Sequence, residues 1–355
     1  MRIVFLTRYA DPDDVNIWSG TFSYMYHTLQ ESHEVICMGG EILAQLRMYQ
    51  SGNFQDNRFV HERYLKVLGR LLAERIDRLD YDVVFFGDNY FVPYLKCKIP
   101  IVRISDVTFQ QFKDYLNYTD ESKIKRTIEM ERLALNNYAH TIYPSEWIKR
   151  KTIEYYSINP DTIDVVEFGA NIPTPVEFQT EIDMQVCNLV FIGKNWKKKG
   201  GDKVLGAYKK LKTEGFSCTL TIIGSVPDMQ QGPDNDITVI PFLNKLKPDD
   251  LEKLCSIYYK SHFLILPTEY DAFGIVFCEA SAYAVPSIAT DVCGVSQPVR
   301  EGKNGFLLPP HATAEDYAKK IRTVFSDKDA YLQLRASSRR EYETRLNLAC
   351  LGKTG

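Results

Sequence analysis

Short apolar runs alternate with amphipathic stretches along the whole chain. Most runs are apolar at every position, which is typical of parallel strands that are buried on both faces. In the first half, strands are predicted at Ile3–Thr7, Glu34–Met38, Val83–Phe86, Ile101–Ile104, Thr141–Tyr143 and Ile163–Val166, and helices at Thr21–Gln30, Glu62–Leu79, Glu121–Asn136 and Ser145–Tyr156. Ser145 is the expected N-cap of the last of these helices.

The alternation starts again near Leu189. Strands are predicted at Leu189–Ile192, Cys218–Ile223, Ile237–Ile240, His262–Leu266, Ser287–Ala289 and Gly305–Leu308, and helices at Asp202–Leu211, Lys247–Tyr258, Ile275–Ala284, Thr313–Phe325 and Asp329–Tyr342. Two successive β-α series predict an α/β protein with two doubly wound, Rossmann-like parallel-sheet domains. Ligands of such sheets bind beyond the carboxyl ends of the strands, so we expect the two domains to face a central cleft that holds the chemistry.

The segment 168–177 has no periodicity and contains Gly169, Pro173 and Pro175, which marks it as the seam between the domains. We therefore expect one domain over residues 1–171 and a second over residues 172–335. A C-terminal helix and tail follow over residues 336–355, and packing of this part back toward the first domain is an open alternative.

Composition narrows the function classes. The 355-residue chain has a formal net charge of −3 with both signs interspersed, which argues against nucleic acid as the main partner. The eight cysteines form no CxxC pair, so we expect no zinc or redox site and a reducing, cytoplasmic location. The N-terminus enters a strand-like run without a signal peptide, and no apolar stretch approaches the roughly 20 residues of a membrane span.

The stretch Tyr64–Leu79 has two interpretations. It carries Leu65, Leu68, Leu72, Ile76 and Leu79 on one side, with basic residues interleaved. Such a stripe is most often the core face of a helix that packs on its sheet. The alternative is a membrane-surface helix, which would allow peripheral association with the inner face of a membrane.

Several well-known motifs are absent or uninformative. The chain has no GxGxxG dinucleotide fingerprint, P-loop, HExxH or GxSxG, and its six histidines do not cluster. Asp-x-Asp occurs at Asp11–Asp13, Asp80–Asp82, Asp234–Asp236 and Asp327–Asp329, and each copy is expected to be a solvated turn. We therefore expect no metal site and no bound cofactor.

Two loops are candidates for ligand binding. In the first, a strand ends near Gly193, four lysines follow within six positions, and a helix begins near Asp202. Lysine charge suits the phosphate of a diphosphate leaving group, although a solvated lysine loop is the alternative. In the second, an acidic loop with Asp271 leads into a helix that starts near Gly274, where a phosphate can bind.

Both carboxylates of the second loop could accept hydrogen bonds from sugar hydroxyls. Asp271 could instead be an ordinary acid at a helix N-terminus. Glu279 has the apolar neighbours Val276, Phe277, Cys278 and Ala280. It is therefore expected to be at least partly buried and to need a partner, because an unpaired buried carboxylate is costly.

These loops resemble those of the retaining glycosyltransferases of the GT-B fold, family 4 type. The family pattern of Glu, seven residues and Glu, with Phe-Gly inside it, reads here as Asp271 to Glu279, and the Gly-Arg, four residues, Lys-Gly loop reads as Gly193-Lys194…Lys199-Gly200. Four further features fit: Leu220–Gly224, the downstream run with Pro286 and Gly294, the Gly302-Lys-Asn304-Gly305 turn, and Val165–Asn171. The likeness covers nearly all of the second half and, more weakly, the first.

The resemblance implies a role for each matching residue. Residues 1–171 would be the acceptor side and 172–335 the donor-binding domain, with Gly193 and Gly224 close to the nucleotide. Lys194 and Lys199 would grip the donor diphosphate, and Glu279 would bind the ribose. Asp271 and the backbone N–H groups of Phe273, Gly274, Ile275 and Val276 would hold the transferred sugar and the phosphate. Gly20 would let the backbone approach the diphosphate, and Asp106 would touch the donor sugar or the acceptor, or only cap its strand.

The implied reaction is the transfer of a sugar from a UDP- or GDP-linked donor to a glycan or lipid-linked acceptor, with retention and without a metal. The departing phosphate would take the acceptor proton, with Lys199, Asp271 and Asp106 as the catalytic candidates. Departures from the family leave a catalytically silent nucleotide-binding relative as an alternative. A GT-B-fold epimerase or phosphorylase is a further alternative, although the residue patterns that they need are not visible. Asp271 replaces Glu, Lys194 replaces Arg, Ser105 stands where His is often found, and Ala284 stands where Gly is common.

Overall fold

The computed structural model describes residues 1–7, 11–15, 17–42, 62–87, 92–113, 115, 118–175, 181–227 and 236–348. Cys350–Gly355, the end of the predicted tail, and Asp234 of one Asp-x-Asp copy lie outside these residues. The chain divides into two compact units, Met1–Val166 and Glu167–Thr354. This division falls five residues before the expected domain boundary between residues 171 and 172.

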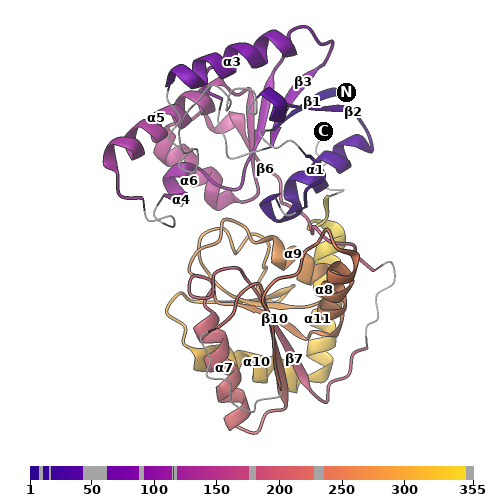
Figure 1. Cartoon of the computed structure of the whole chain (residues 1–355). Coiled ribbons are helices and arrows are strands. Elements are labelled where there is room, and N and C mark those ends of the chain that lie inside the picture. Colours follow the sequence, from indigo (N-terminus) through magenta and orange to yellow (C-terminus); the bar gives the residue numbers. More distant parts are fainter. Residues whose placement is uncertain are drawn as a thin grey trace. The chain divides into compact units, whose positions relative to one another are not determined.

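Unit 1 is built around a six-stranded parallel sheet with strand order β2-β1-β3-β4-β5-β6. The chain runs from β1 to β2 and then returns to the other side of β1, so helices cover both faces; α1 and α3 lie on opposite sides of the labelled strands (Figure 1). The elements are β1 (Arg2–Leu6), η1 (Ile17–Gly20), α1 (Thr21–Gln30), β2 (Glu34–Met38), α3 (Glu62–Ile76), β3 (Val83–Gly87), β4 (Ile101–Ile104), α4 (Phe109–Phe112), α5 (Glu121–Asn137), β5 (His140–Tyr143), α6 (Glu146–Tyr156), η3 (Pro160–Thr162) and β6 (Ile163–Val165).

The leucine stripe on helix α3 was interpreted either as a core face or as a membrane-surface face, and the burial of its side chains decides between the two. Leu65, Leu68, Leu72 and Ile76 are each at most 2% exposed. The stripe therefore forms part of the hydrophobic core of unit 1 and is not a surface for a membrane. Within the described residues, no helix is both long enough and apolar enough to span a bilayer.

Unit 2 repeats the architecture with strand order β12-β11-β10-β7-β8-β9, again all parallel. Its elements are β7 (Cys187–Ile192), α7 (Gly201–Thr213), β8 (Cys218–Ile223), β9 (Ile237–Ile240), α8 (Pro248–Lys260), β10 (Phe263–Leu266), α9 (Ile275–Ala282), β11 (Ser287–Thr290), β12 (Gly305–Leu308), α10 (Ala314–Ser326) and α11 (Lys328–Thr344). Strand order reverses between β7 and β10, which makes the carboxyl ends of these two strands the switch point where doubly wound sheets bind ligands.

The predicted fold class is confirmed, and the differences at element ends have local causes. Ser145 is the predicted N-cap of α6 and accepts a hydrogen bond from the Ile148 N–H. Helix α8 begins at Pro248, since the first helical position needs no N–H donor. Helix α9 ends at Ala282 because Ala284 has a left-handed φ of 55°. The short helices η1, α4 and η3 were not predicted.

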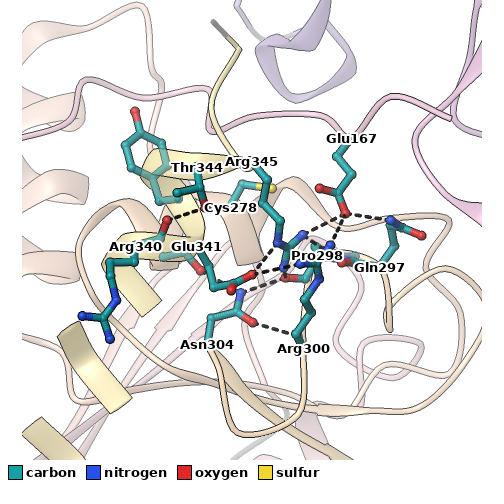
Figure 2. A network of polar contacts seen from close by, with 12 residues as sticks. Glu167, Cys278, Gln297, Pro298, Arg300, Asn304, Arg340, Glu341, Thr344 and Arg345 are labelled. Carbon is teal, nitrogen blue, oxygen red and sulfur yellow. Dashed lines mark hydrogen bonds and ion pairs between the residues drawn. The ribbon is translucent and has the colours of Figure 1, made fainter. Parts of the chain in front are cut away.

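A polar network fastens the first residue of unit 2 to its last helix (Figure 2). The Arg345 guanidinium donates to the Glu167 carboxylate at 2.8 Å and to the carbonyl oxygens of Gln297 and Pro298, each at 3.0 Å. It also pairs with Glu341 of α11. Because the Arg345 side chain is only 10% exposed, this network holds the chain segment that follows Val166 firmly on unit 2.

Candidate functional site

The lysine loop follows β7 and is pinned against the loop that follows β10. Gly200 takes a φ of 75°, and a Cβ on it would lie 2.0 Å from the carbonyl oxygen of Pro267. The Glu269 N–H also donates to the carbonyl of Lys198 at 3.0 Å. Only glycine permits this approach, and the approach brings the lysines to the switch point of the sheet.

Lys199 and Asp271 meet at this switch point. The Lys199 ammonium donates to Asp271 Oδ2 at 2.6 Å and lies 3.4 Å from the carbonyl oxygen of Tyr270. The two side chains are 21% and 17% exposed, so the pair is shielded but reachable. The Gly294 N–H donates to the Asp271 carbonyl at 3.1 Å, which fixes the acidic loop from its other side. Two residues that sequence reasoning placed in separate motifs thus form one ion pair.

The start of α9 lies directly after Asp271. Gly274 is its N-cap, with a φ of 93° and no side-chain cap, and a Cβ there would lie 2.6 Å from the Phe277 ring. The Phe273 ring is buried and packs edge-on against Phe168, with ring centroids 5.6 Å apart. Because the Phe273 ring is buried, this residue can offer a phosphate its backbone only, and the backbone of Gly274, Ile275 and Val276 follows at the same helix start.

Glu279, one turn inside α9, is 4% exposed, which confirms the expected burial. Its Oε1 accepts from Lys245 at 2.6 Å, and its Oε2 accepts from the Tyr258 hydroxyl at 3.0 Å. Burial and the Glu279 charge raise the pKa of Tyr258 well above its ordinary value, so this hydroxyl remains a donor. Lys245 was missed from sequence; the available signal was its place just beyond the predicted strand Ile237–Ile240.

Gly193 and Gly224 end the neighbouring strands β7 and β8. Gly224 has a φ of 90°, and a Cβ on it would lie 3.1 Å from the Gly193 carbonyl oxygen. The structure therefore brings these two predicted donor-site residues side by side. Lys194, the next residue after Gly193, is exposed.

Gly20 and Asp106 belong to unit 1. Gly20 is the N-cap of α1 with a φ of 90°, and it follows Trp18, whose indole N–H donates to Asp106 Oδ2 at 2.9 Å. The loop after Asp106 is held in turn by buried Glu131, which accepts from the Phe109 N–H at 2.9 Å. Burial raises the pKa of Glu131. Trp18, two residues before Gly20, thus links this helix start to Asp106, which lies in the loop that follows strand β4.

The described residues contain no group of three or more His, Cys, Asp or Glu side chains that could hold a metal ion. At the candidate site the structure instead has two shielded lysine–carboxylate pairs, Lys199–Asp271 and Lys245–Glu279. An arrangement of lysines, carboxylates and an uncapped helix start can bind phosphate through its cationic parts and hydroxyls through its carboxylates.

Residues 176–341 match the family model described as Glycosyl transferases group 1. A D-inositol 3-phosphate glycosyltransferase of Corynebacterium aurimucosum is 26% identical over 230 residues, which cover 60% of this chain and 54% of the relative. The sucrose-phosphate synthase of Thermosynechococcus elongatus superposes with a TM-score of 0.70 at 14% identity, covering 99% of this chain and 97% of the other. HepE of Anabaena, in complex with UDP and glucose, superposes with a TM-score of 0.66 at 13% identity, covering 99% and 97%.

Unit 2 is therefore similar to the group 1 glycosyl transferases over residues 176–341, and the chain has the GT-B fold. The match confirms the resemblance to glycosyltransferases that was inferred from the two loops. At such low identities the solved structures establish the fold alone. The chain spans about half the length of the curated relatives it matches.

Proposed function

We propose that the protein is a family 4 type glycosyltransferase that moves a hexosyl group from a UDP- or GDP-sugar to a glycan or a lipid-linked glycan. The observation that carries this proposal is the Lys199–Asp271 pair at the switch point of the unit 2 sheet, next to the start of α9. Such a position is where doubly wound sheets bind nucleotides. The match of residues 176–341 to a glycosyl transferase family supports the same assignment.

In this proposal, the positive charge of the loop after β7 compensates the diphosphate as its bond to the sugar breaks. Lys199 is the central group because Asp271 holds its ammonium at the switch point, and exposed Lys194 adds charge at the entrance. The backbone at the start of α9 binds a phosphate oxygen, and Asp271 accepts hydrogen bonds from hydroxyls of the transferred sugar. Preorganised charge of this kind stabilises a transition state without reorganisation during the reaction.

The proposed reaction proceeds with retention and without a metal ion. The leaving phosphate oxygen takes the proton of the acceptor hydroxyl, so the protein needs to supply position and charge rather than a base. Asp106, oriented by the Trp18 indole, is proposed to contact the acceptor or the donor sugar. Gly20 is proposed to leave room for the diphosphate beside the backbone.

The proposed donor class also has structural support. HepE, which shares the fold over 99% of this chain, was solved in complexes with UDP and with UDP-glucose. A UDP-sugar is therefore the first donor to test, with a GDP-sugar as the second.

The test is a thermal-shift and calorimetry panel of UDP, GDP, ADP, dTDP and their sugar conjugates, with and without EDTA. We expect one base to bind and to raise the melting temperature, with no effect of EDTA. Release of the nucleoside diphosphate in the presence of acceptor glycans then measures turnover. Binding without any release would favour the catalytically silent alternative, which the Asp271 and Lys194 departures motivate. Absence of binding by every nucleotide would refute the proposal.

A further inference from the structure

We propose that Lys245 is a positioning residue that, together with Tyr258, presets Glu279 to read a ribose diol. This inference rests on the proposed function, because it concerns how the nucleotide of the donor is recognised. The two residues hold Glu279 so that each carboxylate oxygen keeps one acceptor position for a hydroxyl. Ribose binding by Glu279 is what the family resemblance implies, and the inference adds Lys245 and Tyr258 as the groups that orient Glu279 for it.

Two donors hold Glu279, and each of them is itself held by further contacts. Lys245 lies in the loop between β9 and α8, and besides Glu279 its ammonium donates to the carbonyl oxygen of Asn171 at 3.2 Å. Tyr258 of α8 stacks on Tyr283, with ring centroids 5.6 Å apart, and the Tyr283 hydroxyl donates to the carbonyl of Pro173 at 2.7 Å. Both donors are therefore themselves held, and Glu279 has little freedom to rotate.

The number of acceptor positions decides what Glu279 can still bind. An ionised carboxylate has about four lone-pair positions, two on each oxygen. In the described part of the chain, Lys245 takes one on Oε1 and Tyr258 takes one on Oε2. One position on each oxygen remains, which matches two neighbouring hydroxyls such as the 2′ and 3′ groups of ribose.

The positive charge of Lys245 offsets the free-energy cost of burying the Glu279 carboxylate. Glu279 is 4% exposed and is surrounded by the apolar side chains of α9, where an isolated carboxylate would be costly. The Lys245 side chain is 18% exposed and supplies the opposite charge at 2.6 Å. Lys245 therefore offsets the cost of burying this charge and orients the Oε1 atom, and its loss should weaken the preference for hydroxyl donors.

The experiment compares a ribonucleoside diphosphate with its 2′-deoxy form by calorimetry. UDP and 2′-deoxy-UDP are used first, and GDP with 2′-deoxy-GDP if guanine is the base that binds. We expect the wild type to prefer the ribose form by about tenfold to hundredfold, the worth of one hydrogen bond to a charged group. Lys245→Met should weaken binding of the ribose form and reduce this preference at least about threefold.

Lys247→Met is the matched control. Lys247 is exposed and lies in the same loop, and its replacement removes the same charge. It should leave the preference unchanged. Tyr258→Phe is the second variant: it removes only the donor to Oε2 and should also reduce the preference. The melting temperatures of all variants identify any variant that fails to fold. If one of Lys245→Met and Tyr258→Phe fails to fold, the other still tests the inference.

The outcomes separate the inference from the proposed function. If the wild type binds and discriminates but both variants keep its preference, the inference is overturned while the proposed function stands. Tighter binding by Lys245→Met would also overturn it, because Lys245 would then compete with the ribose for Glu279. If the wild type binds no nucleotide, the proposed function fails and the inference fails with it.

Discussion

Replacement of Arg345 by methionine tests the structural role of the network in Figure 2. Arg345 holds the carboxylates of Glu167 and Glu341 as well as two backbone carbonyls. Methionine keeps the apolar stem but removes this cation, which leaves Arg300, half-exposed and 3.7 Å from each carboxylate, as a weaker partner. Their side chains are only 13% and 16% exposed, so water can replace the guanidinium only in part.

Removing one partner of a buried ion pair costs about 3–5 kcal/mol. Because Arg300 and solvent still reach both carboxylates, we take the lower end and expect a loss of about 3 kcal/mol in the free energy of unfolding of unit 2. For a domain of this size, each kcal/mol lowers the melting temperature by roughly 2–4 °C. The transition of unit 2 should therefore fall by roughly 6–12 °C.

Hydrogen-exchange mass spectrometry under increasing urea measures this loss, because peptides from unit 1 and unit 2 are read in the same sample. Peptides from α9 and α11 should lose protection at lower urea, while those from the unit 1 strands should not change. Arg340→Met on the exposed side of the same helix is the control and should change stability by less than about 0.5 kcal/mol. A loss below about 1 kcal/mol for Arg345→Met would refute the reasoning.

Three further predictions concern the candidate site and the core of unit 2. Lys199→Met should lower turnover by about 10²–10³-fold with an unchanged circular dichroism spectrum, because a charge partner of the diphosphate is lost; wild-type kinetics would contradict its role. Asp271→Asn should reduce turnover of the nucleotide sugar more than binding of the free nucleotide, and equal losses in the two assays would argue against a sugar contact. Burial lowers the pKa of His262 to about 4, and its ring accepts from the Asn188 N–H and donates to the Asp183 carbonyl, so the folded state does not take a second proton. The unfolded state does so below about pH 6.5, so stability of unit 2 should fall by about 3 kcal/mol between pH 6.5 and 4. Urea midpoints across this range should show a weaker pH dependence for His262→Gln, and identical slopes would count against the assignment.

The elements could be predicted from the sequence because the signals that define them are local. Every predicted strand and helix is present, with ends that differ by at most three residues. Apolar runs in α/β proteins report burial on both faces, and glycine or proline marks where an element stops. The helices η1 and α4 were not predicted because each has only four residues, too few to show a helical periodicity in the sequence.

The spacing of motifs also placed the candidate residues on the right loops. Gly193, Lys199 and Asp271 were expected in the loops that follow two strands, and the structure has them in the loops after β7 and β10. Gly200 and Gly274 show why these loops need glycine, since each has a left-handed φ and lies where a Cβ would collide with a neighbour. A sequence pattern can record such a requirement, because it belongs to one residue and its backbone.

The partners of these residues were decided by the tertiary structure. Lys199 and Asp271 are 72 positions apart, Lys245 and Glu279 are 34 apart, and Glu167 and Arg345 are 178 apart. Each pair meets only because the strand order places particular loops or segments next to one another. The sequence alone therefore determined the elements, the fold class and the loops that carry charge. Which charges pair with one another depends on the distances between loops. These distances are set only when the strands have taken their order in the sheet.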